Sequence, residues 1–457
     1  MDFLYQQFPD KGYPISLFYG VLVVGGILIF LRPFYAFIFS VFGLAAKNFH
    51  AAVFTRTDVF GPYLNLADLL LWISFLSILS QSFYNKKAIT LPRILLCVVA
   101  VIFVASLQSI VSYGLEPYVM RSIWSVCIFP LAFLASNNIV RSEARAKYFY
   151  WALFLGAFFA AMQHMAFLAG VTSMGRMGAA ELRTISYVMN GGYFLLIVAL
   201  FSKSVGNSRL MSNMYYFGLI LIAISFIMAQ TRQLYLVFVV TIIAFAFLFR
   251  EHVKFHKTMI KIVVIGFLVL LISNGLYKNW SLSDIVGGRI ESLTDDGSRT
   301  RSYLTRWLGI QTEMGLWLKS PLFIGVGTSY PPEFTEVFRE GGDTSSNYFV
   351  IGALDHVAVS SYLAHFGLIG FSLYLIFLPL FTMLRSKRLL SMNPSVYVNR
   401  IALLAVAVAL GDVLNMFGSM LNTSPASHVT GLIYGALWGV SSQINSQARE
   451  TKKYAVD

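Results

Sequence analysis

The sequence predicts an all-α, polytopic transmembrane helical bundle, and three observations support this fold class. Of the 457 residues, 57% are hydrophobic and only 12% are charged, about half the charge of an average soluble domain. Apolar runs of roughly 17 to 25 residues, the length that a bilayer core requires, recur along almost the whole chain. The basic residues fall in short clusters between these runs, as membrane topology produces. A nucleic-acid partner is therefore not expected, despite the net charge of +13.

The apolar runs predict twelve spans. The first is divided by Arg32-Pro33 into a good span and a remainder of 14 residues, so thirteen spans are the alternative. The predicted spans lie near residues 15–46, 63–83, 92–113, 119–136, 148–170, 184–202, 213–230, 232–250, 258–276, 357–384, 400–418 and 427–442. No cleavable signal peptide is expected at the N-terminus, because residues 1–14 carry little positive charge and no small-residue cleavage site follows.

Alternate loops differ sharply in basic residues, and this difference sets the orientation. The loops 83–93, 137–147, 203–212, 250–261 and 385–400, with the tail after 442, hold 19 Lys and Arg residues. The opposite short loops, 112–121, 171–183, 230–232 and 419–427, hold four. The first set is therefore expected to be cytoplasmic. The chain then divides into transmembrane helices 1–9 in residues 1–276, a large outer-face loop or cap in 277–355, C-terminal transmembrane helices in 356–442 and a cytoplasmic tail in 443–457.

The outer segment 277–355 is the only part that resembles a soluble protein, with ten of the 21 acidic residues. Apolar and aromatic residues recur every three or four positions from Tyr303 to Trp317, which predicts an amphipathic helix on the outer surface. Pro321 should end this helix, and Gly325-Val326-Gly327 should form a tight turn after it. Arg306 lies on the helix, where a purely solvent-facing position is the alternative to a functional one.

Arginines on the outer side are informative, because the positive-inside bias disfavours them. Arg232 lies in a three-residue polar gap, so it should sit at the membrane surface at the N-terminal end of the following helix. A helix N-terminus and a guanidinium together make an anion site at headgroup depth. A side chain that merely snorkels to lipid phosphates is the alternative.

His356 stands where the outer segment meets an apolar run. A histidine can accept a proton from a hydroxyl near neutral pH, and hydrogen bonding at a helix start is the alternative role. Its helical face should continue through small residues suited to close packing: Ser360, Leu363, Gly367 and Gly370.

Four further polar residues lie within apolar runs: Asp68, His164, His365 and Asp412. Intramembrane ionisable groups are costly and often functional. Satisfied interhelical hydrogen bonds are the other interpretation. Cys97 and Cys127 also lie in apolar runs and are expected to be buried thiols rather than a disulfide or metal site. No metal site and no cofactor are expected.

Three motifs in order resemble the O-antigen polymerase and O-antigen ligase superfamily, which handles lipid-linked glycans at the outer face of the bacterial inner membrane. His356 begins a span eleven residues before "GLIG" at 367–370, with Tyr362-Leu363 between them and Val357 where the family often has Asn. "RWLGIQTEMGLWLKSPLFIGVG" fits the family's arginine helix that runs into Pro-Leu-x-Gly-x-Gly, and it selects Arg306 over Arg299 and Arg301.

The third motif, "QTRQ", resembles the family's polar-Ser/Thr-Arg-Gly step at Thr231-Arg232, with Gln233 in place of glycine. A looser fourth is Arg183 followed by Asn190. Arg183, Asn190, Arg301 and Tyr362 are therefore secondary candidates, beside His356, Arg232 and Arg306.

The resemblance implies a metal-independent glycosyltransferase of the inner membrane, with its active site on the periplasmic face. Its donor would be an oligosaccharide on undecaprenyl diphosphate, and its acceptor a second glycan. His356 would be the general base, and Arg232 and Arg306 would stabilise the leaving diphosphate. Trp280, Trp307, Tyr330 and Tyr348 could stack on sugars. Membrane lipids are expected partners, and a chain-length regulator protein is a candidate one.

Polysaccharide polymerase, for O-antigen or exopolysaccharide, is the expected activity. An O-antigen ligase that transfers glycan to lipid A core is the alternative. A lipid-linked glycan transporter or flippase is the alternative from another class, and its polar residues should lie at mid-membrane depth on broken helices.

Overall fold

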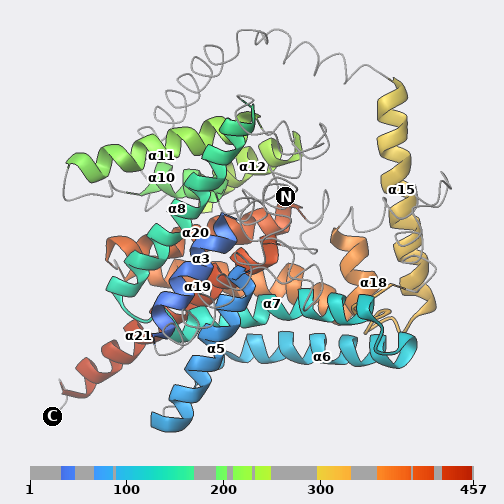
Figure 1. The fold of residues 1–457 in the computed structure, drawn as a ribbon, viewed down its shortest axis with the longest axis horizontal. Helices are drawn as coiled ribbons and strands as arrows, with labels where there is room; N and C mark the ends of the chain where they lie inside the picture. The colour runs from blue at the N-terminus through green and yellow to red at the C-terminus, as the bar shows by residue number, and fades with distance from the viewer. Residues whose placement is uncertain are drawn as a thin grey trace, which may run out of the picture.

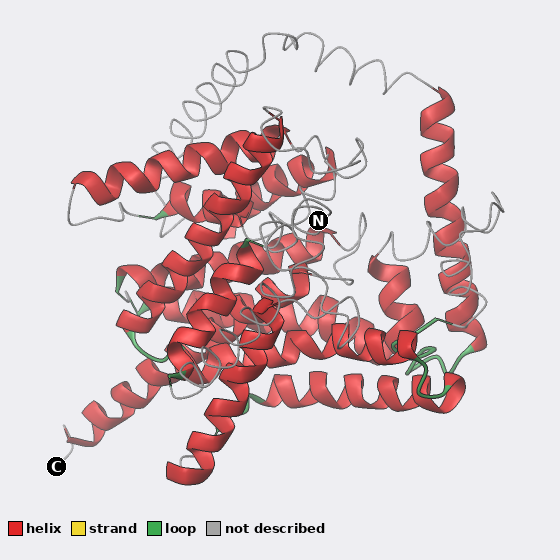
Figure 2. Cartoon of the chain, in the orientation of Figure 1, coloured by secondary structure: helices red, strands yellow, loops and turns green. Residues whose placement is uncertain are grey.

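The computed structural model describes residues 32–46, 66–85, 89–168, 192–202, 209–228, 232–248, 296–330, 358–392, 395–415 and 425–454. Within these ranges every regular element is a helix and none is a strand (Figure 2). The predicted all-α class is confirmed for this part of the chain.

In chain order the helices are α3 (Pro33–Ala45), α5 (Leu66–Asn85), α6 (Arg93–Tyr113), α7 (Pro117–Ile139), α8 (Glu143–Leu168), α10 (Gly192–Phe201), α11 (Arg209–Met228), α12 (Arg232–Leu248), α15 (Asp296–Lys319), α18 (Ala358–Phe371), the π-helix η3 (Ser372–Phe377), α19 (Leu378–Ser391), α20 (Val396–Asn415) and α21 (Pro425–Tyr454).

Five helical segments in the described ranges are long and apolar enough to cross a membrane. They are Arg93–Tyr113, Ser122–Ile139, Arg209–Phe226, Val359–Ser391 and Val396–Leu414. Each falls on a run for which a span was predicted. The run 258–276 lies outside the described residues, so a total of twelve or thirteen spans stays a prediction. Helix α3 begins at Pro33, the position where the first run was expected to divide.

Helices α6 and α7 run side by side, and the lower end of α15 lies near the end where α6 finishes and α7 begins (Figure 1). The opposite end carries basic residues. There Arg141 donates to Thr90 and Asn138, joining the segment before α6 to the end of α7. Desolvation lowers the pKa of the Arg141 guanidinium, and the nearby charge of Arg145 lowers it further. Helix α21 continues to Tyr454, so the predicted tail 443–457 largely prolongs the last helix.

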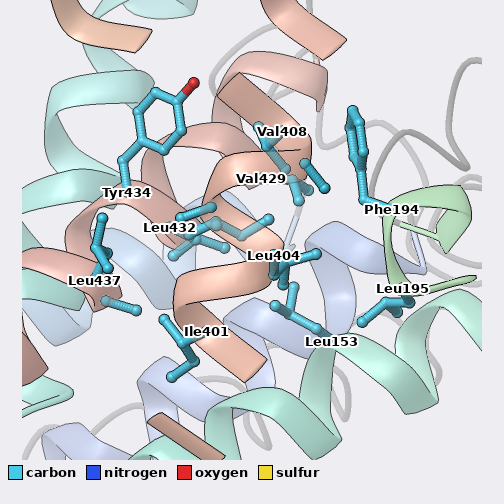
Figure 3. Close-up of a cluster of buried hydrophobic side chains, with 14 of the residues drawn as sticks. Leu153, Phe194, Leu195, Ile401, Leu404, Val408, Val429, Leu432, Tyr434 and Leu437 are labelled. Carbon is cyan, nitrogen blue, oxygen red and sulfur yellow. The ribbon is translucent and has the colours of Figure 1, made fainter. Parts of the chain in front are cut away.

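The core is centred on α20. Its residues from Ile401 to Ala409 are almost completely buried. Leu404 lies among side chains of α8, α10 and α21 (Figure 3). A helix buried on all sides needs apolar residues around its whole circumference, and the run "IALLAVAVAL" supplies them.

Small residues let α21 approach α7 closely. Gly431, Gly435 and Gly439 recur every four positions on one face of α21. A Cβ on any of them would come within 3 Å of a backbone oxygen of the α7 segment, at Phe129, Phe133 or Val140. This small-xxx-small pattern is typical of helix pairs in membranes, where close van der Waals packing drives association.

Candidate functional site

Helix α18 is broken in the middle of its apolar run. Gly367 has φ 60° and ψ −164°, which interrupts the helix. The expectation that the face of His356 continues helically through Gly367 to Gly370 is therefore wrong. The helix is interrupted because another segment of the chain packs against it at Gly367.

That segment is the loop Pro321–Tyr330, which follows α15. The amides of Val326 and Gly327 donate to the carbonyls of Ala364 (2.7 Å) and His365 (3.1 Å). On the other side of the break, the amides of Leu368 and Ile369 donate to Leu322 (3.0 Å) and Phe323 (3.3 Å). The loop thus pairs with backbone groups that the break would leave unsatisfied, as buried irregular backbone in a membrane requires.

The glycines of two sequence motifs make this pairing fit. Gly325 and Gly327 of "PLFIGVG" have φ of 81° and 103°. A Cβ on Gly325 would meet the Ala364 oxygen and the Gly367 nitrogen, and a Cβ on Gly367 would meet Phe323 and Ile324. The predicted tight turn at 325–327 is therefore a docking segment, and the two motifs lie against each other.

The loop also contacts α6. Gln108 donates from Nε2 to the Gly325 carbonyl (2.5 Å). The Ser109 hydroxyl oxygen accepts from the Thr328 hydroxyl (3.2 Å) and the Ser329 amide (3.1 Å). Ser109 is only four residues from the end of α6 at Tyr113, about 6 Å along the helix axis. The loop therefore lies beside two membrane helices rather than wholly outside them.

Next to this loop is a buried acidic side chain. Glu313 of α15 is 1% exposed. One carboxylate oxygen accepts from the Tyr330 hydroxyl (3.0 Å) and the other accepts from Ser360 in the first turn of α18. The ring of Tyr330 also lies on the imidazole of His365, with centroids 4.2 Å apart. We call this group of four the polar junction: Glu313, Tyr330, Ser360 and His365.

The position of Arg306 around α15 follows from the helical backbone. It precedes Glu313 by seven residues, which is close to two helical turns. Both residues therefore belong to one face of α15, the face that meets α18. Arg301 lies twelve residues before Glu313, about 120° around the helix.

Arg232 is the first residue of α12, as its position in the polar gap predicted. Helix α12 packs against α10 and α20. Near the predicted outer end of α20, Asp412 accepts from the Tyr434 hydroxyl (2.8 Å). Helix α20 also contacts η3, the π-helix that continues α18. The structure thus brings the helices of Arg306 and Tyr362 together directly, and it links the helix of Arg232 to them through α20 and η3.

The other candidates divide into two groups. Tyr362 is buried against Phe366 and Tyr374 in an aromatic cluster, so it has a packing role in the described structure. His356, Arg183 and Asn190 lie outside the described residues, as do Trp280 and Tyr348. The side chains of Arg232, Arg301, Arg306 and Asp68 also lie outside them.

The two histidines that lie in apolar runs, His164 and His365, are both hydrogen-bonded to another segment. His164 shares a hydrogen bond with the Ser225 hydroxyl of α11 (2.6 Å). His365 donates from Nδ1 to the Gly327 carbonyl (2.9 Å). Both histidines therefore hold one segment to another. Trp307 remains 46% exposed and accessible, whereas the hydroxyl of Tyr330 is engaged by Glu313.

Glu313 was missed by the sequence reasoning, although a signal was present. It lies at a seven-residue spacing from Arg306 and a four-residue spacing from Gly309, on the side of the helix that is buried. An acidic residue on the packed face of an amphipathic helix needs hydrogen-bond donors from a neighbouring element. That requirement could have indicated a partner in α18.

These features define the class as an α-helical membrane protein with a helix–loop unit docked on a broken membrane helix. No protein-family model matches the chain, and no curated protein matches it. In the described ranges no three His, Cys, Asp or Glu residues come together as a metal site would require.

Proposed function

We propose that the chain is a polysaccharide polymerase of the inner membrane, for O-antigen or exopolysaccharide. It transfers a glycan from undecaprenyl diphosphate to a sugar hydroxyl of the acceptor at the periplasmic face. The proposal is supported by the motifs that resemble the O-antigen polymerase and ligase superfamily. The observation that carries it is the packing of two of these motifs, "PLFIGVG" and "GLIG", on each other.

The reaction is a direct displacement. The acceptor hydroxyl oxygen attacks the anomeric carbon, and the bond from that carbon to the diphosphate oxygen breaks with inversion of configuration. His356 takes the hydroxyl proton as general base. Negative charge grows on the leaving diphosphate, and Arg232 and Arg306 stabilise it. Every bond and the transferred proton are accounted for in this step without a metal ion or cofactor.

A lipid-linked glycan transporter is the second candidate, because α18 is broken in the membrane. In transporters the backbone groups freed by such breaks face the substrate or ion. In this chain the carbonyls of Ala364 and His365 and the amides of Leu368 and Ile369 are taken by the loop Pro321–Tyr330. The break therefore serves to dock the loop, which favours the enzyme.

The test is a comparison of wild type with His356→Ala, Arg232→Ala and Arg306→Ala in cells of the source organism, at matched expression. The surface glycan is followed as a gel ladder, together with the lipid-linked intermediates. Arg209→Ala is the control, because Arg209 is an exposed residue at the start of α11, on the predicted cytoplasmic side.

We expect long chains in wild type and in the control, and single repeat units in the three variants. If full-length chains accumulate on the carrier lipid instead, the protein is a ligase. A ladder that is unchanged in all three variants would overturn the enzymatic proposal and favour the transporter.

A further inference from the structure

Glu313 is costly to bury, and its environment shows how the cost is offset. Transferring a carboxylate from water is unfavourable unless hydrogen bonds replace its hydration. At 1% exposure, Glu313 has lost almost all contact with solvent. The hydroxyls of Tyr330 and Ser360 each donate to one of its oxygens. Hydrogen bonds to a charged acceptor are stronger than those between neutral groups.

The two donors come from different segments of the chain. Tyr330 belongs to the loop that docks on the break in α18, and Ser360 lies in the first turn of α18. Glu313 itself lies in α15, which stands beside α18 (Figure 1). One carboxylate thus joins α15, the docked loop and the start of α18.

The junction is close in the sequence to one residue of the proposed active site and shares a helix with another. Arg306 shares a face of α15 with Glu313. In the sequence, His356 precedes Ser360 by four residues. A shift of α15 relative to α18 would therefore move Arg306 relative to the segment that follows His356. Misplacement of a positioning group by about 1 Å can cost a hundredfold in rate.

We infer that Glu313 is a positioning residue, which holds α15 and its Arg306 in register with the start of α18. This inference rests on the proposed function of Arg306. Glu313 does not touch the substrate. It acts through Arg306, so its removal should matter only while Arg306 is present.

The experiment uses membrane vesicles that contain the full-length protein, with lipid-linked glycan extracted from cells that lack it as the substrate. The initial rate of chain extension is measured against donor concentration for Glu313→Gln and Glu313→Ala. Each variant is made in the wild-type background and with Arg306→Ala. Gln311→Ala is the matched control, because Gln311 is exposed on the same helix.

We expect Glu313→Ala to raise the KM for the donor and to lower kcat/KM by roughly ten- to a hundredfold. Glu313→Gln keeps one acceptor oxygen, so its kcat/KM should fall less than that of Glu313→Ala. The Gln311→Ala control should have the kcat/KM of wild type. A partly unfolded population would instead lower kcat at unchanged KM. In the Arg306→Ala background, Glu313→Ala should add no further loss, since coupled residues are not additive.

Two results would overturn the inference while the proposed function stands. One is wild-type kinetics for both Glu313 variants. The other is a double variant whose fold-loss in kcat/KM equals the product of the losses of Glu313→Ala and Arg306→Ala. That result would mean that Glu313 acts independently of Arg306. If Arg306→Ala alone leaves the kinetics unchanged, the proposed function of Arg306 fails instead, and this outcome is separate from the other two.

Discussion

Gly325 lies directly against Gly367, so that a Cβ on Gly325 would come within 2.7 Å of the Gly367 nitrogen. The first glycine belongs to the loop after α15 and the second breaks α18. Both have positive φ, 81° and 60°. Because neither residue has a side chain, the two backbones approach closely enough to exchange hydrogen bonds on both sides of the break. This contact turns a segment that looks external in the sequence into part of the membrane bundle.

Gly325→Ala and Gly367→Ala should each destabilise this contact. A positive φ costs an L-residue roughly 1 to 2 kcal/mol, and the new methyl group would also meet backbone atoms. Thermal unfolding of the purified protein in detergent measures the loss. Gly315→Ala is the control, since it has no neighbour within 4 Å and lies inside α15. It should be neutral or stabilising by up to about 1 kcal/mol. Equal stability of all three variants would contradict the docking of the loop.

The contact between α21 and α7 depends on the absence of a side chain at Gly435. Gly435→Leu should separate the two helices, because even a Cβ would overlap the backbone of Phe133. Overpacking of a core costs typically about 1 to 3 kcal/mol, and this site offers only backbone to move. The measurement is the yield of folded protein in the membrane and its unfolding temperature. Gly315→Leu is the matched control, and a comparable loss in that variant would show that the effect is not specific to the α21–α7 contact.

The hydrogen bonds of Ser109 give a third prediction. Ser109→Ala removes the acceptor for the Thr328 hydroxyl and the Ser329 amide, and it leaves a buried amide without this partner. Interhelical hydrogen bonds in membranes contribute about 0.6 to 2 kcal/mol, so a loss of that size is expected in thermal unfolding. Ser112→Ala, at an exposed position of the same helix, should leave the unfolding temperature unchanged. A similar unfolding temperature for both variants would mean that the loop does not depend on α6.

The spans and the site differ in how well the sequence predicts them. Apolar runs place α6 within one residue of its predicted start, because length and hydropathy are properties of the segment itself. The start of α12 at Arg232 followed equally well from a polar gap. The break at Gly367 could not be predicted from the sequence, because its cause is a loop distant in the chain. A glycine in an apolar run is also compatible with close packing of unbroken helices. Glu313 was missed for the same reason, since its donors come from α18 and the loop.

Arg306 and Arg301 of α15 should differ in their effect on the reaction. Glu313 faces α18, and Arg306 lies on that face, whereas Arg301 lies about 120° around the helix. Under the proposed function, Arg306→Ala removes a charge that stabilises the leaving diphosphate, and loss of such a group typically costs about 10²- to 10³-fold in rate. Arg301→Ala should cause a much smaller loss. The ratio of long chains to single repeat units, measured at matched protein levels, distinguishes the two variants. If Arg301→Ala is as damaging as Arg306→Ala, the diphosphate site is not confined to the face of α15 toward α18. If only Arg301→Ala is damaging, the sequence motif has selected the wrong arginine.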